Sequence, residues 1–156
     1  MKSLLDCAEE DYTQIAEGLV RWAKGKPVVL LLEGEMGAGK STFARALLAA
    51  LGLQQGFQGS PTFAITHTYP IGSGGRSVTH TDLYRIRHEG ELEQTGVEEL
   101  IWSDTTEWAL VEWSSLFPDF TSQIHNRLSR RKKVCEVEIR FNSSGKRDVL
   151  IREFGT

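Results

Sequence analysis

Residues 34–41 have the types and spacing of a phosphate-binding loop. They read Gly-Glu-Met-Gly-Ala-Gly-Lys-Ser and fit the pattern G-x-x-x-x-G-K-[ST] at every fixed position. Glycines let the backbone curl so that successive N–H groups point toward one phosphate. The helix that follows such a loop presents unpaired amides and a partial positive charge to the same anion. The residues expected to bind the nucleotide are Gly37, Ala38, Gly39, Lys40, Ser41 and Thr42.

Two side chains of this loop have specific predicted roles. The ammonium of Lys40 can reach the β- and γ-phosphates of a nucleoside triphosphate, and the hydroxyl of Ser41 can ligate Mg²⁺. The alternative is a glycine-rich turn with an incidental Lys-Ser pair. A strand predicted before the loop and a helix predicted after it favour the binding site, because the pattern requires this context.

A carboxylate from a second strand would complete the Mg²⁺ site. Glu112 follows the apolar run 109–111, and the C-terminal end of a parallel strand there would lie beside the phosphate loop. Glu112 could ligate the ion directly or through water. For an isolated glutamate, a solvated side chain at a strand end would be the favoured interpretation; the phosphate loop shifts the preference to the metal role.

Two further residues, Asp82 and Thr62, could act near the γ-phosphate, and they complete the expected catalytic set with Lys40. Asp82 could orient a water or hold a metal-bound water, but it could equally cap the turn before residues 83–85. Thr62 follows a proline that restricts the backbone, and it resembles the switch-loop residues that sense γ-phosphate and Mg²⁺ in nucleotide hydrolases. Trp113, directly after the candidate metal ligand, could lie at the rim of the site.

The apolar pattern predicts the elements that would position these residues. Apolar intervals of three and four predict a helix over residues 8–23. The continuous apolar run 28–32 predicts a strand that is covered on both faces. A second helix, which contains Phe43 and Leu47, follows the phosphate loop and ends at Gly52.

The second half of the chain alternates strands with turns. Glycines at 72–75 indicate a hairpin tip, and the strand after it places Val78, His80 and Asp82 on one face. A short helix over 88–94, a buried strand at 109–112 and a C-terminal hairpin over 134–151 complete the prediction. This order predicts an α/β P-loop NTPase fold: a mixed, mostly parallel central sheet flanked by helices, with β-hairpins.

The composition favours one folded domain. The chain has 156 residues, of which 40% are hydrophobic and 25% charged, and its formal net charge is −3. This length is typical of one compact domain, so we expect residues 1–156 to form a single domain built around the phosphate loop. The slightly acidic balance disfavours unaided tight binding to nucleic acid, and DNA is not an expected partner.

Several other classes of protein are disfavoured. Cys7 and Cys135 form no C-x-x-C pair, which argues against a disulfide framework and a thiolate zinc site. No apolar run approaches the roughly 20 residues of a membrane span. Asp6 interrupts any signal-peptide core. We therefore expect a cytoplasmic protein that has no membrane partner.

One basic run, residues 126–133, has several interpretations. A solvated face or a strand flank is the favoured one. The run could also be a docking patch for an acidic partner or RNA, or it could supply an arginine to the nucleotide.

Four motifs together resemble one family, the TsaE (YjeE) ATPases that are required for threonylcarbamoyladenosine (t6A) modification of tRNA. In chain order they are residues 34–43 (Gly-Glu-Met-Gly-Ala-Gly-Lys-Ser-Thr-Phe), 60–63 (Ser-Pro-Thr-Phe), 80–85 (His-Thr-Asp-Leu-Tyr-Arg) and 111–113 (Val-Glu-Trp). The last three together are far more specific than the phosphate loop alone. The resemblance covers nearly the whole chain.

The resemblance implies that residues 1–156 form a single P-loop ATPase domain, which depends on Mg²⁺ and is slow alone. It would work with TsaD, which transfers the threonylcarbamoyl group, and with TsaB, the dimer partner of TsaD, and it would meet tRNA through this complex. Hydrolysis of ATP would drive a conformational cycle. The resemblance also implies that Ser41 and Glu112 act on Mg²⁺, that Thr62 and Asp82 support hydrolysis, and that Glu9 borders the adenine.

The departures from the family pattern are mild. Ser41 replaces the commoner threonine, which keeps the hydroxyl, and Thr81 stands where an apolar residue is frequent. Neither change removes an implied ligand. The basic run has no counterpart that we can assign.

Two other classes of function remain as alternatives. A small-molecule P-loop kinase usually needs a lid with positioned arginines, and the sequence has no clear lid. A signalling GTPase would carry the guanine-reading motif N-K-x-D, which does not occur in the chain.

Overall fold

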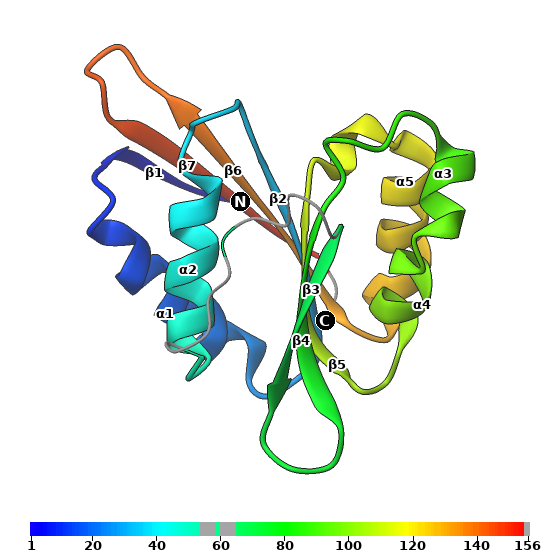
Figure 1. The fold of residues 1–156 in the computed structure, drawn as a ribbon. Coiled ribbons are helices and arrows are strands. Elements are labelled where there is room, and N and C mark those ends of the chain that lie inside the picture. Colours follow the sequence, from blue (N-terminus) through cyan, green and yellow to red (C-terminus); the bar gives the residue numbers. More distant parts are fainter. Residues whose placement is uncertain (54–58, 60–64, 155–156) are drawn as a thin grey trace.

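A computed structural model places one mixed sheet at the centre of the molecule, with helices on both faces (Figure 1). It describes residues 1–53, 59 and 65–154. Within these residues the sheet has seven strands in the spatial order β1-β7-β6-β2-β5-β4-β3. Their bounds are β1 Lys2–Cys7, β2 Val28–Gly34, β3 Thr66–Ile71, β4 Arg76–Asp82, β5 Thr106–Glu112, β6 Lys133–Phe141 and β7 Arg147–Phe154.

Helices α1 and α2 cover one face of the sheet, and α3, α4 and α5 cover the other (Figure 1). The helices are α1 Asp11–Ala23, α2 Lys40–Ala50, α3 Glu89–Gln94, α4 Val97–Trp102 and α5 Pro118–Arg127, with short 3-10 helices at Ser114–Leu116 and Leu128–Arg130. In the described part of the chain, no helix combines the length and hydropathy that a membrane crossing requires.

The parallel pairings lie in the middle of the sheet. Strand β2 pairs in parallel with β5 and β6, and β4 pairs in parallel with β5. Strands β1, β7 and β3 add antiparallel pairings at the two margins. The connections between β2 and β3, β4 and β5, and β5 and β6 contain helices, whereas short turns join the antiparallel pairs β3–β4 and β6–β7. Strands β1 and β7, which also pair antiparallel, come from opposite ends of the chain. The predicted mixed α/β sheet with helices on both faces and β-hairpins is therefore confirmed.

Some elements differ from the sequence-based prediction. Helix α1 begins at Asp11 rather than near Ala8, because Ala8 lies in a turn where its N–H donates to Asp11 Oδ2 at 2.8 Å. The edge strand β1 was not predicted, and neither were α4 and α5. Strand β1 is exposed along almost its whole length, so its sequence lacks the alternation that burial of one face produces.

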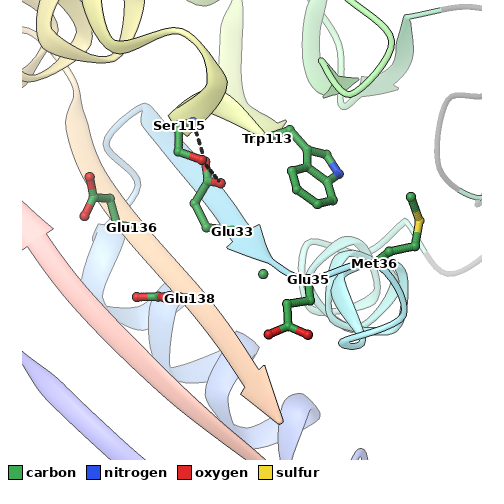
Figure 2. A pocket seen from close by; sticks show the side chains of 8 residues that line it. Glu33, Glu35, Met36, Trp113, Ser115, Glu136 and Glu138 are labelled. Carbon is green, nitrogen blue, oxygen red and sulfur yellow. Dashed lines mark hydrogen bonds between the residues drawn. The ribbon is translucent and has the colours of Figure 1, made fainter.

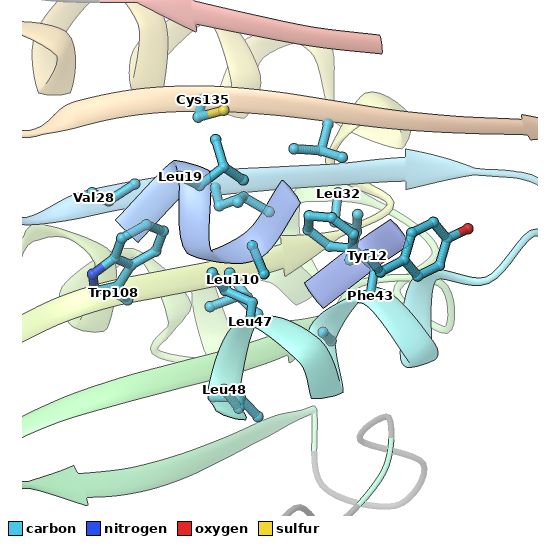
Figure 3. Packing of buried hydrophobic residues seen from close by; sticks show 14 of the residues in the cluster. Tyr12, Leu19, Val28, Leu32, Phe43, Leu47, Leu48, Trp108, Leu110 and Cys135 are labelled. Carbon is cyan, nitrogen blue, oxygen red and sulfur yellow. The ribbon is translucent and has the colours of Figure 1, made fainter. Parts of the chain in front are cut away.

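Alternation along the central strands divides the core between the two faces. Leu32 and Leu110 pack with α1 and α2 (Figure 3). Leu31 and Val111 belong to the part of the core on the side of α3, α4 and α5. Because successive side chains of a strand point to opposite faces, Glu112 lies on the α1–α2 side, one position after Val111. This is the side on which α2 follows the phosphate loop.

The prediction of a solvated face is correct for only part of the basic run. Arg127, Arg130 and Arg131 are exposed, but Lys132 and Lys133 are buried. The run leads into the first residues of β6, at the opposite end of the parallel strands from the phosphate loop. It therefore does not supply an arginine to the nucleotide site.

The buried Lys132 ties α4 to β5. Its Nζ donates to the carbonyl oxygens of Ile101 at 2.7 Å, Ser103 at 2.6 Å and Thr106 at 3.2 Å. Burial lowers the pKa of the Lys132 ammonium from an ordinary 10.5 to about 8, partly opposed by Asp104. Between pH 8 and 10.5, the Lys132 side chain is therefore mainly protonated in the unfolded chain and mainly deprotonated in the folded chain.

We expect the free energy of unfolding of the protein, relative to a Lys132→Met variant, to rise between pH 8 and 10.5. The unfolded state binds more protons in this window, so stability increases with pH, by up to about 3 kcal/mol. Urea denaturation of both proteins at several pH values measures the difference. An Arg127→Ala variant is the control, because Arg127 is exposed and does not contribute to the pKa shift of Lys132. Parallel curves for Lys132→Met and the parent chain would contradict the prediction.

Candidate functional site

The phosphate loop joins the end of β2 to the start of α2. Gly37 and Gly39 adopt φ angles of 77° and 113°, which side chains other than glycine rarely tolerate. Gly39 caps α2, and among the described residues no side chain bonds to the cap and no acidic residue lies in the first turn. The start of α2 thus lacks a side-chain cap in this part of the chain, and its positive dipole end suits an anion from outside the chain.

Strands β6 and β7 support the loop from behind. A Cβ atom on Gly34 would lie only 2.5 Å from the carbonyl oxygen of Ile139 on β6, so the two backbones approach too closely for any side chain. On β7, Arg147 donates from Nε to the carbonyl oxygen of Ala38 at 3.2 Å. The loop is therefore fixed by residues more than one hundred positions further along the sequence.

Helix α1 supports the loop through Tyr12. A Cβ on Gly39 would lie 2.8 Å from the Tyr12 hydroxyl, which is buried and has no hydrogen-bond partner in the described residues. The Tyr12 ring also packs edge-on against Phe43 of α2, with 5.5 Å between ring centroids. Glu9, the residue implied to border the adenine, is exposed in the turn before α1, and its carbonyl accepts from the Tyr12 N–H at 3.1 Å.

We expect Gly39→Ala to destabilise the protein more than Gly37→Ala. Both changes place a side chain in the left-handed region, which costs about 1–2 kcal/mol. Only Gly39 adds an overlap with Tyr12, since nothing lies within 4 Å of a Cβ on Gly37. Chemical denaturation of the two variants gives the comparison, and equal losses of stability would show that the Tyr12 contact imposes no constraint.

Lys40 is buried at the base of the loop, with 6% of its surface exposed. Its Nζ donates to the carbonyl oxygens of Gly34 at 2.7 Å and Glu35 at 2.9 Å. The same ammonium lies 4.4 Å from the centroid of the Trp113 ring, within the range of a cation–π interaction. Lys40 therefore lies inside the loop with its charge held by oxygen dipoles and an aromatic face.

Two carboxylates lie beside each other where β4 and β5 end. Asp82 and Glu112 are direct neighbours in the parallel pairing, and Glu112 also pairs with Leu32 of β2, two residues before the phosphate loop. Glu112 is 2% exposed, and its Oε1 lies 3.0 Å from Nε2 of His80. Asp82 accepts the N–H of Tyr84 at Oδ1, at 2.9 Å.

The charges of these groups influence one another. Burial raises the pKa of Asp82, and the charge of Glu112 adds to this rise, while the hydrogen bond from the Tyr84 N–H and the charges of His80 and Lys40 oppose it. Burial lowers the pKa of Lys40, an effect that the negative charges of Glu112, Asp82 and Glu33 counteract. The strand ends thus bring two carboxylates and one ammonium close enough to interact electrostatically.

Trp113 covers this arrangement from the rim. It follows β5 with a φ of 63°, an uncommon conformation for a bulky residue, and such strain is often found at functional sites. Its ring lies over Lys40 and 4.9 Å from the Tyr84 ring, measured between centroids.

A cavity of about 540 Å³ adjoins the loop on the other face of the sheet (Figure 2). It is lined by Glu33, Gly34, Glu35, Met36, Trp113, Ser115, Glu136 and Glu138. Glu33 is held in this cavity by the hydroxyls of Ser114 at 2.7 Å and Ser115 at 2.8 Å. Since Glu33 and Glu138 alternate with core residues of the α1–α2 side, they point away from Glu112.

The structure brings Lys40, Asp82, Glu112 and Trp113 close to one another, and the roles that the sequence suggested for them stay predictions. Ser41 lies in the first turn of α2, next to Lys40. The remaining predicted loop residues, Gly37, Ala38, Gly39 and Thr42, form the loop and the same first turn. Thr62 lies outside the described residues.

Sequence reasoning assigned no role to His80, Tyr12 or Arg147, which all contact the proposed site. One signal for His80 was present, because a histidine that shares a strand face with Asp82 and a buried valine is itself expected to be buried. A buried polar group needs a hydrogen-bond partner. No comparable signal exists for Tyr12 and Arg147, whose contacts with the loop depend on how α1 and β7 pack.

Comparisons with known proteins agree with this architecture. The sequence model of the family "Threonylcarbamoyl adenosine biosynthesis protein TsaE" matches residues 7–149. The tRNA threonylcarbamoyladenosine biosynthesis protein TsaE of Haemophilus influenzae is 32% identical over 120 residues, which cover 73% of each chain. The protein of the same name from Bacillus subtilis is 34% identical over 126 residues, 80% of this chain and 75% of that one.

A solved structure shares the fold. The crystal structure of Bacillus subtilis YdiB aligns with a TM-score of 0.69 at 24% identity, and the alignment covers 99% of this chain and 86% of that one. At this identity the similarity is evidence for the fold alone. The match of the family model to most of the sequence, together with relatives above 30% identity, places the chain in the threonylcarbamoyl adenosine biosynthesis protein TsaE family.

Proposed function

We propose that this protein is a Mg²⁺-dependent ATPase that serves the threonylcarbamoyladenosine modification of tRNA. One observation carries the proposal: the phosphate loop, with Lys40 at its base, lies beside the neighbouring carboxylates of Asp82 and Glu112. The names of the relatives from Haemophilus influenzae and Bacillus subtilis support the pathway.

The residues of the site fit a triphosphate and its metal ion. The uncapped start of α2 and the left-handed glycines suit an anion, and the hydroxyl of Ser41 and the carboxylate of Glu112 are oxygen ligands of the kind that Mg²⁺ prefers. Within the described residues, no three His, Cys, Asp or Glu side chains form a metal-binding group. A Mg²⁺ ion here would take its other ligands from phosphates and water, and it would neutralise charge on the phosphates.

Each residue of the site has a distinct task in the proposed reaction. Lys40 would exchange the carbonyl oxygens of Gly34 and Glu35 for phosphate oxygens, and Trp113 would shield that contact from water. Asp82 would orient the attacking water through Oδ2, since Oδ1 accepts the Tyr84 amide. Its raised pKa makes Asp82 a stronger base for the proton of that water.

We also propose that hydrolysis serves a complex rather than a small-molecule acceptor. On this proposal TsaD and TsaB are the protein partners, the cytoplasm is the location, and tRNA is reached through the complex. The resemblance of the motifs to the TsaE family supports these partners. A pull-down of the tagged chain from cell extract, with and without ATP, tests them: co-purification of a TsaD–TsaB pair is expected, and its absence under both conditions would contradict the proposal.

The fate of the γ-phosphate distinguishes the proposed ATPase from a kinase. We expect incubation with γ-labelled ATP, Mg²⁺ and a panel of metabolites to release labelled inorganic phosphate only. Label on a small molecule would overturn the ATPase proposal in favour of the kinase alternative. Calorimetric titration with ATP and GTP tests the nucleotide preference, and tighter binding of GTP would argue for a GTPase.

A further inference from the structure

We propose that His80 is a positioning residue that holds the Glu112 carboxylate in the orientation required for nucleotide-bound Mg²⁺. The inference rests on the proposed function and adds a residue that none of the predicted roles includes. His80 lies on β4 and Glu112 on β5, so the contact depends on the pairing of two strands whose contacting residues are 32 positions apart.

The contact is well defined by distance and burial. Nε2 of His80 lies 3.0 Å from Oε1 of Glu112, and the two side chains are 0% and 3% exposed. No bulk water is available at this depth to replace the bond. A buried carboxylate without this hydrogen bond would destabilise the folded protein, so the bond to His80 favours one orientation of the Glu112 side chain.

The strand register explains why His80 can reach Glu112. His80 is paired with Leu110, and Glu112 lies two residues further along β5 on the same face. Diagonal neighbours at this spacing are within reach of long side chains. Because Asp82 is the direct neighbour of Glu112, the same register places His80 behind the two carboxylates, toward the interior of the sheet.

The bond to His80 also limits a competing interaction. Lys40 carries the nearby positive charge, and Glu112 raises its pKa. A Glu112 side chain released from His80 would be attracted to this ammonium. That pairing would engage the proposed metal ligand and the proposed phosphate ligand with each other. By occupying Oε1, His80 restrains the carboxylate and leaves Oε2 for a cation.

A purely structural histidine–glutamate pair predicts a different result. If the bond only stabilised the sheet, its loss would reduce the free energy of unfolding without changing how Mg²⁺ affects nucleotide binding. A positioning role predicts a loss that depends on Mg²⁺. Residues that orient a metal ligand typically contribute about 10–100-fold to metal affinity.

Two amide variants make the test. In His80→Gln the side-chain amide lies near the position of Nε2 and can still donate to Glu112, whereas the shorter amide of His80→Asn cannot reach it. The measurement is calorimetric binding of a non-hydrolysable ATP analogue with Mg²⁺ and with EDTA. We expect the factor by which Mg²⁺ increases analogue affinity to be at least about tenfold smaller in His80→Asn than in the parent chain. The affinity measured in EDTA should be unchanged. His80→Gln should behave like the parent chain.

His67→Asn is the matched control, because His67 pairs with His80 from β3 but belongs to neither the proposed metal site nor the loop. Its Mg²⁺ effect should equal that of the parent chain. Equal Mg²⁺ effects in the Asn and Gln variants of His80 would overturn the positioning role. If Mg²⁺ did not increase the nucleotide affinity of the parent chain, the proposed function would fail instead. If Glu112→Gln lost this increase in affinity and His80→Asn kept it, only the role of His80 would fail.

Discussion

Lys40→Ala is expected to weaken ATP binding by about a hundredfold. The ammonium would make charge-assisted hydrogen bonds to phosphate oxygens, each worth about 1.5–3 kcal/mol, and a tenfold change in affinity corresponds to about 1.4 kcal/mol. Part of this gain is offset, since Lys40 must first leave the carbonyl oxygens of Gly34 and Glu35. The alanine variant also removes the cation that lies over Trp113. Calorimetric titration with ATP and Mg²⁺ measures the loss.

A matched charge removal shows whether the effect is local. Lys2 is an exposed residue of β1 whose ammonium lies 3.6 Å from Glu153. Lys2→Ala changes the net charge by the same amount, and we expect it to leave ATP affinity nearly unchanged. If both variants bound ATP equally well, Lys40 would not be a phosphate ligand. The free energy of unfolding of both variants, measured in urea, shows whether either loss reflects a damaged fold.

Glu112→Gln is expected to lower Mg²⁺-dependent ATP hydrolysis by roughly a hundredfold or more. Charge stabilisation by a correctly held metal ion contributes several kcal/mol to a transition state, and about 1.4 kcal/mol corresponds to a factor of ten in rate. The amide keeps the size of the side chain and an oxygen that can accept from His80, but it removes the negative charge. Nucleotide binding in EDTA should change by only a few fold. Rates of phosphate release and calorimetric affinities give the two quantities.

Glu138→Gln provides the comparison for Glu112. Glu138 lines the cavity next to the loop, but it lies on the opposite face of the sheet from Glu112. The Glu138→Gln change removes one negative charge near the site but leaves the carboxylates at the ends of β4 and β5 in place. We expect Glu138→Gln to hydrolyse ATP at nearly the parent rate. If Glu112→Gln reduced nucleotide affinity equally in Mg²⁺ and in EDTA, this result would argue against a metal role for Glu112.

Much of the fold follows from local patterns. The apolar run of β2, the glycines of the loop and the periodic apolar residues of α2 predicted a strand–loop–helix unit, and the structure contains it in the same place. These features are readable because their cause is local: strand and helix periods differ, and glycines mark left-handed backbone. The short helices α4 and α5 and the exposed strand β1 lack a strong period, and their positions depend on the sheet that they pack against.

The sequence by itself determined the chemical inventory of the site: a phosphate loop with Lys40 and Ser41, and carboxylates at Asp82 and Glu112 after apolar segments. Only the tertiary structure decided which partner each group contacts. The bond between His80 and Glu112 requires the register of β4 against β5, and the support of Ala38 by Arg147 requires the hairpin of β6 and β7 to lie behind the loop. Such contacts join residues far apart in sequence, so their geometry arises from packing and strand pairing, which a local pattern of residue types does not contain.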